Sequence, residues 1–130
     1  MKELLTQYPK AAKIVKDYYL EKFMKGLEGK DFPPEYLEHV KQQGIQLNIV
    51  EKVLENSPRQ LVDVFDENQL YLDVAPCYDD SNTKIMFFFT IHKGEINFED
   101  LGKEGKYNTR IEAEKEAIKS AFEALESKLN

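Results

Sequence analysis

The chain has 130 residues, of which 42% are hydrophobic and 32% charged, which is typical of one globular domain with a buried core and excludes a disordered chain. Its net charge is -6 and its only arginines, Arg59 and Arg110, lie far apart in sequence, which argues against a shared bidentate clamp on phosphate. The single cysteine, Cys77, excludes an internal disulfide. The N-terminus is polar and no apolar run is long, which predicts a cytoplasmic protein with no membrane segment.

The first half of the chain predicts helices. Apolar residues recur there at three- and four-residue spacing, and Pro9 and Pro34 each suit a first helical turn, where a missing N–H has no effect. Ser57 suits the N-cap position before Pro58. The predicted helices cover residues 9–29, 34–43, 46–56 and 57–66.

After residue 68 the apolar spacing changes to two, which predicts three strands joined as an antiparallel meander. The strands cover residues 70–75, 84–91 and 95–99, with Pro76 at the end of the first. The middle strand is the densest apolar run of the chain. We expect a four-residue loop, from Asp79 to Asn82, between the first two strands. A register that differs by one residue would place the apolar side chains of the two strands on opposite faces of the sheet. The four-residue loop pairs Leu70 with Ile91, Leu72 with Phe89 and Val74 with Phe87.

The two faces of this sheet differ. One is strongly apolar and suits a covering helix; its middle-strand residues are Ile85, Phe87, Phe89 and Ile91. The other mixes apolar and polar groups, with Met86 beside Ala75, Phe88 between Asp73 and Glu99, and Thr90 between Tyr71 and Asn97. This second face is the candidate interaction face, and we expect either the N-terminal helices or a partner to cover it. Its candidate residues are Tyr71, Asp73, Met86, Phe88 and Thr90.

The last part of the chain predicts an amphipathic helix that ends near Leu129. Thr109 and Glu112 have the spacing of a capping box, with Thr109 as the N-cap. The apolar stripe that follows is expected to pack on the sheet, and consists of Ile111, Ala117, Ile118, Ala121, Phe122, Leu125 and Leu129. The fold class is therefore α+β in a single domain, with a helical part over residues 1–56 and an α-β-β-β-α part over residues 57–130.

Two resemblances involve this second part. The order of its elements, with the loop and helix start from Gly105 to Glu114, is similar to the double-stranded RNA-binding domain, which places a glycine-bearing loop and a basic helix N-terminus there. The resemblance implies that fold, and it implies contact with phosphates through that region. The C-terminal helix, from Tyr107 to Glu126, also resembles small uncharacterised proteins of phages and mobile elements, which implies an accessory role.

The sequence contains no glycine-rich phosphate loop and no hydrolase or metalloprotease motif. Cys77 and His92 lie at opposite ends of the predicted hairpin, so we expect neither a catalytic dyad nor a metal site, and no cofactor. The leading hypothesis is a non-enzymatic protein-interaction or accessory module that binds a protein partner or associates with itself. One alternative is nucleic-acid binding through Lys103, Lys106 and Arg110, which the net charge disfavours, and another is an inhibitor that acts through an acidic surface.

Overall fold

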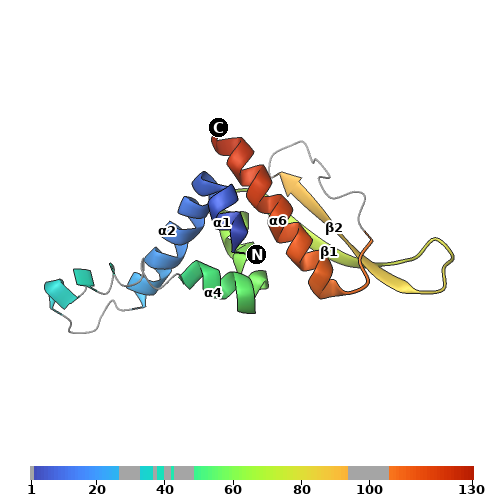
Figure 1. The fold of residues 1–130 in the computed structure, drawn as a ribbon, viewed down its shortest axis with the longest axis horizontal. Coiled ribbons are helices and arrows are strands. Elements are labelled where there is room, and N and C mark those ends of the chain that lie inside the picture. The colour runs from blue at the N-terminus through green and yellow to red at the C-terminus, as the bar shows by residue number, and fades with distance from the viewer. Residues whose placement is uncertain (1, 27–32, 37, 40–41, 43–48, 94–105) are drawn as a thin grey trace.

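The computed structural model describes residues 2–26, 33–36, 38–39, 42, 49–93 and 106–130. Over these residues the chain combines helices with a two-stranded antiparallel sheet (Figure 1). The α+β class is therefore confirmed. The predicted third strand, over residues 95–99, lies outside the described residues, so the three-stranded meander is not confirmed and stays a prediction.

The N-terminal part begins with two consecutive helices, α1 (Glu3–Gln7) and α2 (Pro9–Lys25). Proline opens α2, as predicted from its position in the sequence. The short helix α1 was not predicted, because five residues are too few to show a helical period. Of the predicted helix over residues 34–43, residues 34–36, 38–39 and 42 are described and are helical. The next predicted helix is described from residue 49 onward, as α4 (Ile49–Asn56).

The predicted helix after residue 56 is divided into a 3-10 turn, η1 (Pro58–Leu61), and a short α-helix, α5 (Val62–Glu67). Ser57 occupies the N-cap position before Pro58, as predicted, but its hydroxyl makes no capping hydrogen bond. The carbonyl of Ser57 instead accepts a hydrogen bond from the N–H of Gln60 at 3.0 Å, which is the i to i+3 pattern of a 3-10 turn.

The hairpin consists of β1 (Leu70–Tyr78) and β2 (Ile85–Lys93), and its register differs from the prediction by two residues. The observed pairs on the apolar face are Leu72 with Ile91, Val74 with Phe89, Pro76 with Phe87 and Tyr78 with Ile85. The loop between the strands, residues 79–84, has six residues rather than four. An even shift leaves each side chain on its face, so the assignment of residues to the two faces is confirmed.

Two interactions explain the longer hairpin. The carboxylate of Asp79 accepts hydrogen bonds from the N–H of Thr83 at 2.8 Å and of Lys84 at 3.3 Å, which holds residues after Asn82 in the loop. The prediction that β1 ends near Pro76 is wrong. The Phe87 N–H donates to the Tyr107 carbonyl, and the Phe87 carbonyl accepts from the Tyr107 N–H. The strand partner of Phe87, Pro76, therefore lies in a pair that needs no N–H donor.

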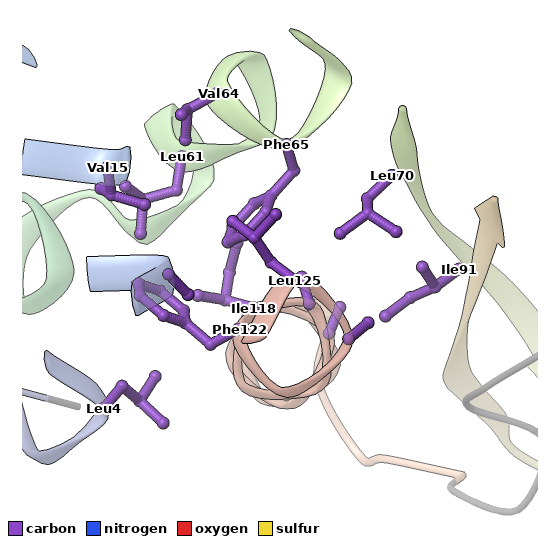
Figure 2. Packing of buried hydrophobic residues seen from close by; sticks show 14 of the residues in the cluster. Leu4, Val15, Leu61, Val64, Phe65, Leu70, Ile91, Ile118, Phe122 and Leu125 are labelled. Carbon is purple, nitrogen blue, oxygen red and sulfur yellow. The ribbon is translucent and has the colours of Figure 1, made fainter. Parts of the chain in front are cut away.

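The C-terminal helix α6 (Arg110–Leu129) lies at the centre of the molecule, between the sheet and the helices of the N-terminal part (Figure 1). Its bounds agree with the prediction, and the Thr109 hydroxyl accepts the N–H of Glu112 at 3.1 Å, as predicted for the N-cap. Figure 2 shows Phe122 and Ile118 on α6 near Leu61 and Phe65, with the strands on the other side of the helix. One core cluster includes buried residues from α1, α2, α4, η1, α5, both strands and α6.

The predicted apolar stripe of α6 and the predicted apolar face of the hairpin are wrong at their ends, where some of the residues are exposed. Ile111 and Leu129 are 63% and 40% exposed, and Ala113 and Ala124 are buried in their place. Ile111 and Leu129 lie in the terminal turns of α6, where fewer elements surround the helix. Ile85 is 55% exposed, because the end of the hairpin extends beyond α6 (Figure 1).

Candidate functional site

The candidate interaction face is the side of the hairpin opposite α6. Directly paired residues on this face are Tyr71 with His92, Asp73 with Thr90, Ala75 with Phe88 and Cys77 with Met86. The structure thus brings all five predicted residues onto one face but corrects their neighbours, because the register is shifted by two. The predicted neighbours Asn97 and Glu99 lie outside the described residues.

The side chains of this face are left out of the core. Phe88, Met86 and Thr90 are half-buried, Asp73 is exposed and Tyr71 is 43% exposed. Among the strand residues, the core cluster includes those of the opposite face, such as Phe89 and Ile91. The helices α1, α2 and α4 lie on the far side of α6 from the sheet (Figure 1), so these N-terminal helices do not cover the candidate face.

The loop at the end of the hairpin is organised by one carboxylate. Besides the N–H groups of Thr83 and Lys84, Asp79 accepts hydrogen bonds from the hydroxyls of Ser81 at 3.1 Å and Thr83 at 3.2 Å. These bonds, that of the Thr83 N–H above all, lower the pKa of Asp79 below its usual value. The Asp79 carboxylate is therefore engaged within the loop, where it fixes the hairpin end.

The basic residues of the alternative nucleic-acid site are engaged with the hairpin. Lys103 lies outside the described residues. The Lys106 ammonium donates to the Asp80 carboxylate at 2.8 Å, and this hydrogen bond raises the pKa of Lys106. Arg110 Nη1 donates to the Val74 carbonyl at 3.2 Å, and its guanidinium lies 5.0 Å from the centre of the Phe87 ring. A phosphate at Lys106 would compete with the Asp80 carboxylate.

A feature that sequence reasoning missed is a pocket shared by both arginines. Arg59, from η1, and Arg110, from α6, line one pocket together with Glu114. Arg59 Nε donates to Glu114 Oε1 at 3.1 Å; the Arg59 side chain is 69% exposed and that of Glu114 is 16% exposed. The inference that the sequence separation of the arginines keeps them apart is therefore wrong. Only the placement of η1 against α6 brings them together, and no local sequence signal reports that.

Cys77 and His92, the two residues that could have formed a dyad, lie far apart on the hairpin. Cys77 is paired with Met86, and His92 is paired with Tyr71, six positions away along β1. At about 3.3 Å per residue this separation is roughly 20 Å, too far for a dyad. Within the described ranges, no three His, Cys, Asp or Glu side chains are grouped so that they could hold a metal ion.

None of the helices described is long and apolar enough to cross a membrane. Comparisons of the chain with protein-family models, with curated proteins and with solved structures found no match. Any functional conclusion must therefore come from the chemistry of the surfaces.

Proposed function

We propose that the chain is a non-enzymatic protein-interaction module of the cytoplasm. Its partner binds the candidate interaction face, which is the outer face of the hairpin. The observation that carries the proposal is the position of Phe88 and Met86, which lie on the sheet face opposite α6 and outside the core cluster. A sheet face with large apolar side chains is usually covered by another element or by a partner. Asp73 and Thr90 on the same face supply polar contacts, a mixture found at interfaces between separately folded proteins.

The size of the face predicts a weak association. Two strands of nine residues each form a face about 30 Å long and 10 Å wide, or roughly 300 Å². A standard stable interface buries about 800 Å² per partner. The hairpin alone therefore supports a transient complex, and the simplest partner to examine first is a second copy of the chain.

Light scattering after gel filtration tests this proposal directly. The wild-type chain should show a mass that rises from one copy towards two as the concentration rises, and Phe88→Asp should remain a single copy with an unchanged circular dichroism spectrum. Ile111→Asp is a matched control, since it places the same charge on an exposed apolar residue of α6. A wild-type chain that stays monomeric at millimolar concentration would overturn self-association through this face.

Four further hypotheses concern other functions and the rest of the sheet. Nucleic-acid binding, with the fold of the double-stranded RNA-binding domain, is the second candidate, although Lys106 and Arg110 already have intramolecular partners. Inhibition through an acidic surface is the third, and it depends only on the net charge of -6. The third strand of the sheet, over residues 95–99, is part of the proposed fold, as is an accessory role like that of small phage proteins.

A further inference from the structure

A pocket of about 390 Å³ lies beside β1, and its walls come from three parts of the fold. Leu72 and Val74 line it from β1, Val62 lines it from α5, and Ile118 is one of the apolar residues that α6 contributes. Pockets that hold small-molecule ligands have volumes of about 300–1,000 Å³. This pocket is therefore large enough to accept an apolar side chain from a partner.

The pocket follows the unpaired edge of β1. The N–H and C=O of Phe87 point towards Tyr107, away from β1, so Phe87 and its partner Pro76 share no hydrogen bond. Because these directions alternate along an antiparallel pair, the N–H and C=O groups of the even-numbered β1 residues all point away from β2. Among the described residues the sheet ends at β1, and the outward N–H groups of Leu72 and Val74 have no hydrogen-bond partner. Such an edge can bind an extended peptide as an additional strand.

Two side chains already satisfy outward carbonyls on this edge. Arg110 donates to the carbonyl of Val74, and Lys106 Nζ lies 3.4 Å from the carbonyl of Tyr78. Pro76 has no N–H to offer, and the Val74 carbonyl already accepts from Arg110. A new strand can therefore pair with the N–H and C=O of Leu72 and with the N–H of Val74. The available edge thus coincides with the part of β1 that lines the pocket.

The charge of the pocket is opposite to that of the chain. Its charged lining consists of two guanidinium groups, Arg59 and Arg110, and one carboxylate, Glu114, which leaves one net positive charge in a chain of net charge -6. Each guanidinium has five N–H donors. The hydrogen bonds found use two donors of Arg59 and one of Arg110, so both retain N–H groups for a carboxylate.

We propose that this groove binds an extended acidic peptide of a partner protein, which adds to the free edge of β1. Side chains of a strand point to the same face at every second residue. The peptide would therefore place an apolar side chain in the pocket and an Asp or Glu two residues away against Arg59 and Arg110. This site is distinct from the outer face of the hairpin, and the inference does not depend on the function proposed for that face.

Peptide binding tests the inference. The probes are fluorescein-labelled nine-residue threonine peptides, each with Val, Leu, Phe or Tyr at its centre and glutamate two positions later. Each has a twin with glutamine in place of glutamate and a second twin with glutamate directly next to the apolar residue, which would point to the opposite face. At least one glutamate peptide should bind about tenfold more tightly than both of its twins. If no glutamate peptide does so, the inference is overturned.

Protein variants locate the binding. Arg59→Gln and Arg110→Gln should each weaken binding of the glutamate peptide about tenfold and leave the glutamine twin unchanged. Lys13→Gln makes the same change of charge at a side chain that is 80% exposed, and it should have no effect. Circular dichroism shows whether each variant is folded. If Arg59→Gln and Arg110→Gln are folded and bind the glutamate peptide as wild type does, the assignment of the site is overturned.

Amide hydrogen exchange distinguishes strand addition from other binding. The outward amides of Leu72 and Val74 should exchange more slowly when the peptide is bound, and Phe88→Asp should bind the peptide as wild type does. Protection of amides on β2 alone, or no protection of Leu72 and Val74, would contradict strand addition. A monomeric wild-type chain that still binds the peptide would refute self-association and leave the groove intact.

Discussion

The neighbouring residues Phe88 and Phe89 point to opposite faces of the hairpin, so truncating each one measures how differently the two faces are packed. Phe89 is 4% exposed, belongs to the core cluster, and stacks on Tyr107 with ring centres 6.0 Å apart. Phe89→Ala should therefore lower the free energy of unfolding by about 3–5 kcal/mol, the range found for buried phenylalanines. Phe88 is half-buried and outside that cluster, so we expect Phe88→Ala to cost about 1 kcal/mol or less.

Urea unfolding followed by circular dichroism measures both values. A domain of this kind has a total stability of about 5–15 kcal/mol, so Phe89→Ala should remove a large share of it and lower Tm by roughly 10–20 °C. The measurement is made at micromolar concentration, where a weak complex is dissociated. Equal losses for the two variants would refute the account, because they would mean that the outer face is buried within the monomer.

Further predictions concern the hairpin end, a helix contact and nucleic acid. Hydrogen bonds such as that from the Thr83 N–H lower the pKa of Asp79 in the folded chain. They therefore stabilise the fold at pH values above the ordinary carboxyl pKa, and this stability is lost as the pH falls through the lower pKa of the folded chain. In urea unfolding, wild type should exceed Asp79→Asn in stability at pH 6, and this difference should shrink as the pH falls below the ordinary carboxyl pKa; a difference that does not change with pH would contradict this. Tyr19 donates to the Gln60 carbonyl at 2.9 Å, and burial raises its pKa to about 12, so this contribution is complete below pH 10 and is lost as pH rises through 12. Ultraviolet titration of wild type against Tyr19→Phe measures that value, and ionisation near pH 10 would argue against the contact. Because Lys106 is engaged, gel-shift titration at low salt should show no binding of duplex RNA, whereas salt-sensitive binding lost in Lys106→Glu would favour the nucleic-acid hypothesis.

Local signals in the sequence predicted much of the fold. Proline at the start of α2 and Thr109 before α6 were correctly placed, because both effects act within one helical turn. Period-two alternation correctly divided the hairpin into two faces. The same alternation could not fix the register, since a shift of two residues leaves the faces unchanged and the choice depended on the side-chain hydrogen bonds of Asp79.

The rest of the candidate surfaces depended on tertiary contacts. The residues of the outer face could be named from the sequence, but whether the N-terminal helices covered it could not, because that depends on how those helices pack on α6. The pocket of Arg59 and Arg110 could not be predicted at all, since the two residues are 51 positions apart (110 minus 59) and meet only because η1 packs against α6.

The concentration dependence of backbone amide signals tests the central claim most directly. In heteronuclear NMR spectra of the wild-type chain, recorded from micromolar to millimolar concentration, the amide shifts of the outer-face residues Tyr71, Asp73, Met86, Phe88 and Thr90 should change together. The same residues should show no change in Phe88→Asp. Shifts that are constant across the concentration range, or that change mainly in α2, would contradict an interaction surface on the outer face of the hairpin.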